Sequence, residues 1–528
     1  MSDDANQNQD QEQQGKVSRR RFLGVAGAGA AAATVGGFSN ARAESVPVQN
    51  IPERRTDVVV AGAGMGGLTA AVRAQSQGAD VILLEKAADP GGTMRESAGG
   101  IHGGASSYEE MRERCPWGDA DLQRALATNL PRSYSFYESI DAPVGPPGDN
   151  PLSRSIGRPP VAFSNFMVNT FESQGGTLLT ETPLLRLVRN SRDEVIGVVA
   201  EGPDGPIRIL ANAVILATGG WAGNAEMVHR YITREFQSIH QRNCGFAGLQ
   251  PALTGDGFLA ATSIGAAPSD GGFDSFYGHL LPARPAQFSH PLIDYSLYHG
   301  EWVVALNVRG ERFTDESRGK LSGWGVEHTP SEQALNVEVA YQPDAAAAYI
   351  WDHHINETQA LAEQNLGTID KYEAFRQAGA PVARADTLED LADQMERWGR
   401  GMPAEKVLRE LTQYNEAARN GRAAALPIPK EDPEYAVPVS EPPFYAVLGQ
   451  TGLTGSYGAL KANAEGQVLS RTTRPIPGLY AAGIDIGNIA ANSQYLGFLG
   501  YGAAFGYISG TNAANHPGPQ GGWEIASS

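Results

Sequence analysis

A glycine-rich turn between a buried strand and a helix constrains the fold of this chain more than any other feature. Residues 58–61 form a short β-branched run, typical of a strand buried in a parallel sheet. The run leads directly into GAGMGG at residues 62–67 and then into a helical pattern. Glycines at 62, 64 and 67 would give the tight turn, the close backbone approach to a pyrophosphate and the close packing of helix on strand. The unpaired N–H groups at the helix start favour phosphate.

A second strand follows this helix and ends in an acidic residue. The segment DVILLE ends at Glu85, where a carboxylate can accept hydrogen bonds from the hydroxyls of an adenosine ribose. Strand, glycines, helix, second strand and terminal acid together predict a Rossmann-like α/β unit that binds a dinucleotide. This unit alone does not distinguish NAD from FAD.

Four further segments carry a family resemblance. They are KAADPGGTMRESAGGIHGG after Glu85, AVILATGGWAGN at 213–224, TGDGFLAATSIGA at 254–266 and IPGLYAAGIDIG near the C-terminus. In these motifs and their order, from about residue 55 to about residue 515, the chain resembles the FAD-binding family of fumarate reductase flavoproteins and 3-ketosteroid dehydrogenases. The resemblance implies FAD as the cofactor and a Rossmann-like FAD-binding domain interrupted by an α+β cap domain that binds substrate.

The resemblance also implies that both ends of the chain contact FAD. Leu184 would hold the adenine through its backbone, and Gly483 would approach the ribityl chain. Ile484 stands where the family commonly has Glu or Asn, so Asp485 is the candidate for that role. Thr93 aligns with the His that tethers FAD in some members, so we expect non-covalent binding. The expected cofactor-binding residues are Gly62, Gly64, Met65, Gly66, Gly67, Glu85, Lys86, Gly91, Gly92, Thr93, Ser97, Gly99, Gly100, Leu184, Ala217, Thr218, Gly219, Asp256, Gly483 and Asp485.

The resemblance leaves the substrate open between two classes. Ketosteroid dehydrogenase-like members polarise a ketone with a Tyr and a backbone N–H four residues on, which implies Tyr495 and the N–H of Leu499 in YLGFLG. Fumarate reductase-like members bind a dicarboxylate and deliver a proton from a cap arginine, which implies Arg318 in NVRGERFTDESRGK, with Lys320 near it. Two carboxylate-binding side chains of that family are missing, because GQTGLTGSYGAL replaces an HTMGG-like segment and NSQYLGFLG replaces NRLGGNA.

The leading expectation is therefore an FAD-dependent oxidoreductase acting on a CH–CH bond next to a carbonyl, with a 3-ketosteroid-like or enone substrate. One alternative is a reductase of an unsaturated carboxylic acid, and another is a flavoprotein that only relays electrons to a partner. An aromatic stretch either lines a pocket for a flat apolar substrate or packs within the cap. Its residues are Phe276, Tyr277, Tyr295, Tyr298, His299 and Trp302.

The N-terminal residues resemble a bacterial twin-arginine signal peptide. The stretch SRRRFLG at residues 18–24 precedes an Ala/Gly-rich apolar run too short for a bilayer of about 30 Å, and residues 41–43 read Ala-Arg-Ala. This order predicts cleavage near Ala43 and export of the folded protein to the periplasm or beyond by the twin-arginine machinery. A disordered basic N-terminus is the alternative.

Length and composition bound the remaining possibilities. The chain of 528 residues predicts an FAD-binding domain at 52–275 and 440–515, with a cap at 276–439. A formal charge of −18 argues against nucleic acid as a partner. Cys115 and Cys244 form no haem or iron–sulfur motif, so the electron-transfer partner is not identified, and their pairing is left open. The adjacent His353 and His354 lack metal-ligand spacing, and we expect no metal site.

Overall fold

The buried run at residues 58–61 lies at the centre of a mixed sheet. The computed structural model describes residues 51–157, 160–232, 240–241, 252–271, 273–283, 286, 297, 300–319, 333–358, 370–490 and 496–526. In it the run belongs to strand β1 (Glu53–Ala61), which pairs in parallel with β2 (Val81–Leu84) and β8 (Gly205–Leu216). The valine side chains at 58, 59 and 60 are fully buried, as expected for a strand covered on both faces.

Within the described ranges this sheet has eight strands, and its path runs β15, β16, β8, β1, β2, β5. The pairs from β16 to β5 are parallel, whereas β7 joins β8 and β6 joins β7 in antiparallel pairs. The predicted α/β class with a Rossmann-like unit is confirmed. The strands not yet bounded are β5 (Thr177–Leu179), β6 (Leu184–Arg189), β7 (Val195–Gly202), β15 (Gln467–Leu469) and β16 (Pro475–Ala481).

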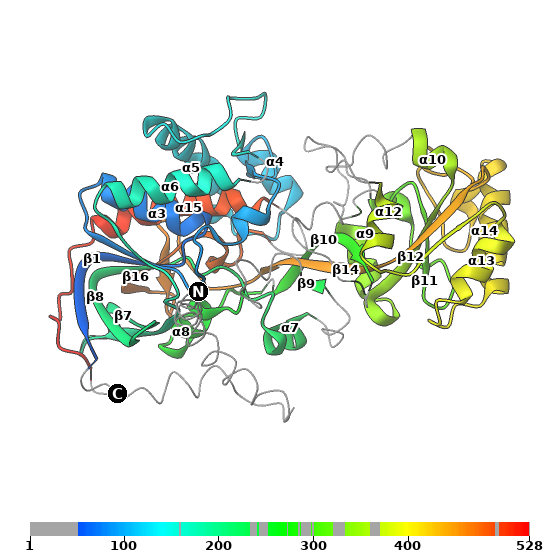
Figure 1. Ribbon diagram of the computed structural model, residues 1–528. Helices are drawn as coiled ribbons and strands as arrows, with labels where there is room; N and C mark the ends of the chain where they lie inside the picture. The colour runs from blue at the N-terminus through cyan, green and yellow to red at the C-terminus, as the bar shows by residue number, and fades with distance from the viewer. Residues whose placement is uncertain are drawn as a thin grey trace, which may run out of the picture. The chain divides into compact units, whose positions relative to one another are not determined.

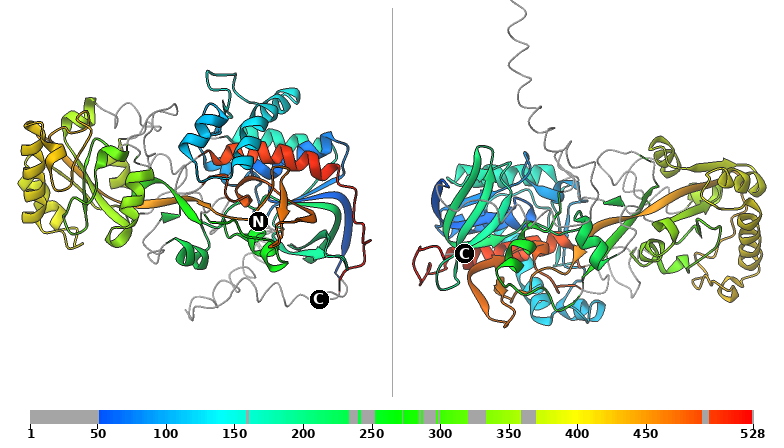
Figure 2. Two further views of the ribbon diagram at one scale, coloured as in Figure 1. Left: turned by 180° about the vertical axis from the view of Figure 1, so that it is seen from behind. Right: turned by 90° about the horizontal axis from the view of Figure 1, so that it is seen from below.

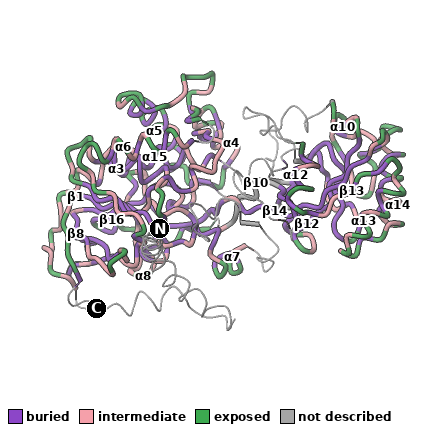
Figure 3. The backbone as a smooth tube through the Cα atoms, viewed as in Figure 1, coloured by how far each residue is buried: buried purple, intermediate pink, exposed green. Residues whose placement is uncertain are grey.

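Helices from both ends of the chain cover one face of this sheet (Figure 1). They are α3 (Met65–Ser76), α5 (Ala120–Ser139), α6 (Val161–Ser173) and α15 (Phe498–Ala514). Helix α15 approaches α3 closely because two glycines of α15 face α3. A Cβ on Gly506 would lie 2.7 Å from the Gly66 oxygen, and a Cβ on Gly510 would lie 2.5 Å from the Ala70 oxygen. The last helix therefore packs directly on the helix that follows the glycine-rich turn, and most residues of both helices are buried (Figure 3).

A second sheet of six described strands follows the path β10, β14, β12, β11, and β13 and β9 also pair with β14. The amphipathic helices α13 (Leu388–Glu396) and α14 (Ala404–Arg419) pack together beside it (Figure 2) and bury Leu391, Met395, Val407 and Leu411. This placement supports a scaffold role for both helices. The strands are β9 (His240–Gln241), β10 (Asp274–Pro282), β11 (Val304–Asn307), β12 (Ala346–Trp351), β13 (Val382–Ala385) and β14 (Phe444–Tyr457).

Shorter elements complete the described part of the chain. They are η1 (Gly92–Glu96), β3 (Gly100–His102), α4 (Tyr108–Arg114), β4 (Ser153–Ser155), α7 (Ala225–Tyr231), α8 (Asp256–Ser263), η4 (Glu316–Gly319), α9 (Gln333–Ala340), η5 (Pro343–Ala345), α10 (His353–Thr358), α12 (Lys371–Gln377), η6 (Ala423–Ala425) and η7 (Gly483–Asp485). Of the described helices, none is long and apolar enough to cross a membrane.

Several expectations about chain organisation stay predictions. Strand β14 begins after the domain boundary predicted at residue 440. It pairs with β12 and β13 over residues 444–450 and with β10 over residues 449–457, and these three partner strands come before residue 440. The domain boundaries thus remain predictions. Cys115 is buried, and Cys244 lies outside the described residues, so their pairing is not tested. The twin-arginine segment also lies outside them.

Candidate cofactor and active site

The carboxyl ends of the parallel strands lie in register at one edge of the first sheet. Ala61 pairs with both Leu84 and Leu216, and Leu216 pairs with Ala481. The segments that follow these strands contain residues predicted to meet FAD: the glycine-rich turn, Glu85, residues 217–219, and Gly483 and Asp485. In open parallel sheets, ligands bind at this edge, where the connections diverge to opposite faces. Segments far apart in the sequence are thereby brought to one place.

The glycine-rich turn leaves an open cradle at Gly64. Gly62 has a φ of +101°, and a Cβ there would lie 2.2 Å from the Ala217 oxygen, whereas a Cβ on Gly67 would lie 1.7 Å from the Gly62 oxygen. A Cβ on Gly64, by contrast, meets no protein atom within 4 Å. Gly64 is also the N-cap of α3, and no described side chain caps that end. The first N–H groups of α3 and the space above Gly64 fit a pyrophosphate.

Glu85 braces this turn. Its Oε2 accepts a hydrogen bond from the Ala63 N–H at 2.9 Å, and its Oε1 accepts one from the Ala87 N–H at 2.8 Å. Burial raises the pKa of the carboxyl, and these two backbone hydrogen bonds oppose the rise by favouring the charged form. Each carboxylate oxygen can accept more than one hydrogen bond, so Glu85 can still accept hydrogen bonds from ribose hydroxyls.

A cleft with an empty volume of about 550 Å³ opens at this edge. Eleven of the predicted cofactor residues line it. Sequence reasoning missed three further lining residues: Thr182, two positions before Leu184, and Ala252 and Leu253, directly before the TGDG motif. Strand residues Ala61 and Leu84 complete the lining. The predicted residues in the lining are Gly62, Gly64, Glu85, Lys86, Gly92, Thr93, Leu184, Ala217, Thr218, Gly219 and Asp256.

The other predicted cofactor residues lie outside that lining, and several have structural tasks. Gly66 approaches the C-terminal segment, because a Cβ on it would lie 3.2 Å from the Gly483 nitrogen. Ser97 Oγ donates to the Met94 oxygen at 2.7 Å and accepts from the Gly99 N–H at 3.1 Å. These bonds hold the backbone between η1 and Gly99. The residues outside the lining are Met65, Gly66, Gly67, Gly91, Ser97, Gly99, Gly100, Gly483 and Asp485.

Lys86 and Asp256 form an ion pair at the side of the cleft. Lys86 Nζ donates to Asp256 Oδ2 and to Thr254 Oγ1, both at 2.9 Å, and Thr254 Oγ1 donates to Asp256 Oδ1 at 2.6 Å. Asp256 is the first residue of α8. The TGDG motif is thereby joined to the residue after Glu85, which holds two walls of the cleft together.

Asp485 joins the C-terminal segment to the segment at 217–219. Thr218 Oγ1 lies 3.1 Å from both Asp485 oxygens, the Gly219 N–H donates to Oδ2 at 3.0 Å, and Thr218 Oγ1 accepts from the Gly257 N–H at 2.9 Å. Asp485 is fully buried, and burial raises its pKa to about 7 against the opposing effect of these hydrogen bonds. In the structure this carboxyl therefore binds the protein behind the cleft lining.

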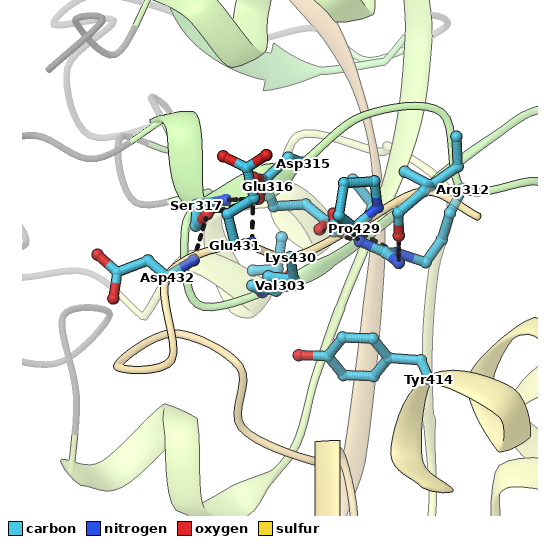
Figure 4. A network of polar contacts seen from close by, with 12 residues as sticks. Val303, Arg312, Asp315, Glu316, Ser317, Tyr414, Pro429, Lys430, Glu431 and Asp432 are labelled. Atoms are coloured by element: carbon cyan, nitrogen blue, oxygen red, sulfur yellow. Dashed lines mark hydrogen bonds and ion pairs between the residues drawn. The ribbon is translucent and has the colours of Figure 1, made fainter. Parts of the chain in front are cut away.

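A buried ionic network supports the cap segment that carries Arg318 (Figure 4). Arg312 forms a bidentate pair with Glu316, with Nε–Oε1 at 3.0 Å and Nη2–Oε2 at 2.6 Å, and its Nη1 donates to the Ile428 oxygen at 2.6 Å. Lys430 Nζ donates to the Val303 oxygen at 2.8 Å, and burial lowers the pKa of Lys430 to about 8. Both cations lie over the Tyr414 ring. Arg312 and Glu316 are thus held inside the protein, two to six residues before Arg318.

The predicted catalytic residues are described only in part. Tyr495 lies outside the described residues, and Arg318 is described only as part of the backbone of η4. Leu499 lies in the first turn of α15. The structure does not show these three side chains together, and their catalytic roles stay predictions.

Of the aromatic stretch, one side chain is described. Trp302 is buried, and its ring packs edge-on against Tyr435 with centroids 4.7 Å apart, so it belongs to the core beside the second sheet. The side chains of Phe276, Tyr277, Tyr295, Tyr298 and His299 lie outside the described ones. His353 and His354 lie in α10, and the described residues contain no group of three or more His, Cys, Asp and Glu that could hold a metal ion.

Comparison with protein families places the chain. The model of the family described as FAD binding domain matches residues 161–497, and a model described as FAD dependent oxidoreductase matches residues 57–223. The chain belongs to the FAD binding domain family. It is an FAD-dependent oxidoreductase, and the cleft at the strand ends, with its open cradle at Gly64, fits this cofactor.

Individual relatives are distant but cover most of the chain. A probable fumarate reductase of Shewanella frigidimarina (strain NCIMB 400) is 26% identical over 88% of this chain and 76% of its own length. A vinyl phenol reductase of Lactiplantibacillus plantarum is 24% identical over 87% of this chain and 96% of its own length. The fold is also that of an open flavocytochrome c3 fumarate reductase (TM-score 0.68, 24% identity, 91% and 82% coverage) and of the 3-ketosteroid Δ1-dehydrogenase from Sterolibacterium denitrificans (TM-score 0.66, 19%, 87% and 99%).

The open cradle leads to a test of cofactor binding. Gly64→Val should fold but lose bound FAD, because its Cβ meets no protein atom within 4 Å and the side chain fills the space where the pyrophosphate would approach. The measurement is flavin absorbance per mole of purified protein, beside far-UV circular dichroism. Gly148→Val, at a loop glycine where a Cβ also meets nothing within 4 Å, is the matched control and should keep its flavin. A Gly64→Val protein with full flavin content would contradict this assignment.

The buried carboxyl of Asp485 leads to a test of pH dependence. Its folded-state pKa of about 7 lies above the unfolded value, so its contribution to stability is present at low pH and is lost as pH rises toward 7. Relative to Asp485→Asn, the wild type should lose on the order of 2 kcal/mol of unfolding free energy between about pH 5 and about pH 7.5. Thermal unfolding at both pH values measures this. Asp270→Asn, at an exposed position, is the control, and an equal pH dependence in wild type and Asp485→Asn would refute the prediction.

Proposed function

We propose that this chain is an exported FAD-dependent oxidoreductase that adds or removes hydrogen across a carbon–carbon bond next to a carbonyl group. The names of its relatives support the bond type, since they include a vinyl phenol reductase and a probable fumarate reductase. The likeness of fold to a 3-ketosteroid dehydrogenase agrees with a carbonyl substrate. The substrate is a small molecule, and a ketone or enone is the class we favour.

The start of α15 carries this proposal. The helix begins at Phe498 with Gly497 as its N-cap, and no side chain in the described part of the chain caps it. The N–H of Tyr501 makes the first turn's bond to the Gly497 oxygen at 3.2 Å. The N–H of Leu499 precedes that bond, so it has no acceptor within the helix. A free N–H at the positive end of a helix suits a carbonyl oxygen that gains negative charge during reaction.

Under this proposal, residues of this chain have separate roles in cofactor binding and in catalysis. Bound FAD supplies a two-electron redox centre. The turn at Gly64 and the first N–H groups of α3 hold the pyrophosphate, and Glu85 holds the ribose. The Tyr495 hydroxyl and the Leu499 N–H both donate to the substrate carbonyl oxygen, which stabilises an enolate-like charge there. A positioned acid or base must also move one proton at the neighbouring carbon.

A reductase of an unsaturated acid is the second candidate. It is favoured by the cap segment, in which the Arg312–Glu316 pair fixes the turn that leads to Arg318. A guanidinium at that position would bind a carboxylate and supply the proton. In either reaction an electron-transfer partner must exchange electrons with FAD, and a protein that only relays electrons would show no flavin bleaching or reoxidation with any small substrate.

One pair of variants separates the ketone from the acid. Tyr495→Phe should keep FAD and the fold but lower kcat by about 10² to 10³, because it removes one donor to the carbonyl oxygen. Arg318→Lys keeps the charge and loses the planar fork, so its effect should be mild on a ketone and severe on an acid. Steady-state kinetics with an enone and an unsaturated acid measure both. Full activity of Tyr495→Phe beside collapse of Arg318→Lys would replace the ketone proposal with the acid reductase.

Export by the twin-arginine route is a separate part of the proposal. The order of paired arginines, short apolar run and Ala-Arg-Ala site supports it. An FAD site built from both ends of the chain also agrees with loading before export.

Replacement of Arg19 and Arg20 by Lys should leave folded, FAD-loaded protein in the cytoplasm, because the signal is read by a receptor. Fractionation with flavin fluorescence measures this, and the mature wild type should begin near Glu44. Equal export of the variant would argue against the signal.

A further inference from the structure

The end of β14 lies beside the wall of the cofactor cleft. Ser456 Oγ accepts a hydrogen bond from the Trp221 N–H at 3.0 Å, and Trp221 Nε1 donates to the Gly458 oxygen at 2.8 Å. Trp221 follows residues 217–219 of the cleft lining by two positions. A Cβ on Gly220 would lie 2.4 Å from Ser456 Oγ, so the two segments are in close contact. Residues 456–458 therefore pack against the segment that continues the cleft lining.

Gly455, just before these residues, lies directly against the ring of Phe498. A Cβ on Gly455 would lie 2.3 Å from Phe498 Cε2, and its three nearest atoms would all belong to that ring. The ring thus occupies the space into which any side chain at 455 would extend. Phe498 directly precedes Leu499, whose N–H is the proposed donor to the substrate carbonyl.

The position of the Phe498 ring is fixed from several sides. Its centroid lies 5.3 Å from that of Tyr457 and 5.8 Å from that of Tyr501. The backbone that carries it is held against β3, because Cβ atoms on Gly497 and Gly500 would lie 2.2 Å and 2.0 Å from the His102 oxygen. Phe498 is only partly buried, whereas Tyr457 and Tyr501 are buried, so Phe498 is the residue of the three that keeps exposed surface.

Thr454 adds an uncharged polar group to this region. Residues 276 and 277 of β10 pair with residues 455 and 453, so Thr454 is the extra residue of a β-bulge. Its Oγ1 is buried and has no hydrogen-bond partner among the described residues. An unpaired buried hydroxyl costs free energy, and a ligand group that forms a hydrogen bond with it would remove that cost.

We propose that Phe498, seated over Gly455, is a specificity-determining residue that selects an uncharged, flat, ring-containing carbonyl substrate. The inference rests on the proposed function and names its substrate class. The ring offers an apolar face for stacking, and a carboxylate placed against the same face would lose its water without gaining a counter-charge. A neutral ketone keeps its hydrogen bond to the Leu499 N–H without this cost.

Two probes of the same skeleton test the proposal. Benzylideneacetone and cinnamate share a phenyl ring and a conjugated double bond, but the first carries a neutral methyl ketone and the second a carboxylate. Their dissociation constants for the oxidised holoprotein are measured from the change in absorbance of bound FAD. The wild type should bind benzylideneacetone at least about tenfold more tightly than cinnamate.

Variants assign this selectivity to the ring. Phe498→Leu should weaken benzylideneacetone binding by about five- to tenfold and leave cinnamate binding nearly unchanged, because the stacking face is lost. Gly455→Ala should act in the same direction, since the new methyl group displaces the ring. Tyr507→Leu removes another partly buried aromatic from α15, at a place where it contacts Arg73 and Phe136, and should leave the ratio of dissociation constants unchanged.

The outcomes separate this inference from the proposed function. An unchanged ratio in Phe498→Leu, a wild type that prefers cinnamate, or a wild type that binds neither probe overturns the role of Phe498. If selective binding depends on Phe498 but benzylideneacetone does not reoxidise the reduced holoprotein, the carbonyl reaction fails and the role of Phe498 in ligand choice stands.

Discussion

The crossing of three backbone segments at Gly62 is the constraint on which the rest of the structure depends. The carbonyl of Gly62 lies so close to Gly67 that only glycine fits there, and Gly62 itself lies against the carbonyl of Ala217. These approaches fix the start of α3 against the ends of β1 and β8, where the first N–H groups of the helix would meet a pyrophosphate. A side chain at either glycine would separate the strand from its helix and open the cleft.

The C-terminal part of the chain packs against the same segments. Glycines of α15 let it pack on α3, and Asp485 ties its own segment to Thr218 and Gly219 by buried hydrogen bonds. The glycine-rich turn and the segment at Asp485 therefore both contact residues 217–219, which line the cleft. The first turn of α15 then stands beside β14, where Phe498 and Gly455 meet.

Local patterns in the sequence predict most of the residues that line the cleft but not the contacts between distant segments. The strand, turn, helix and acid around GAGMGG are adjacent in sequence, so their geometry follows from the motif, and the resemblance extends this to Asp256 and residues 217–219. The hydrogen bond between Thr218 and Asp485 and the packing of Phe498 against Gly455 join residues that are far apart in the sequence. No local pattern predicts these contacts. Asp485 is buried and bonds to Thr218 and Gly219, and its role toward the cofactor stays a prediction. The roles of Tyr495 and Arg318 stay predictions.

The most direct test is anaerobic reoxidation of the dithionite-reduced holoprotein in a stopped-flow instrument, with cyclohex-2-enone and fumarate offered separately. The absorbance of oxidised FAD reports the reaction without knowledge of the natural electron partner. A carbonyl-linked CH–CH oxidoreductase should be reoxidised by the enone, with fumarate far slower. Rapid reoxidation by fumarate, with no reaction of the enone, would contradict the account.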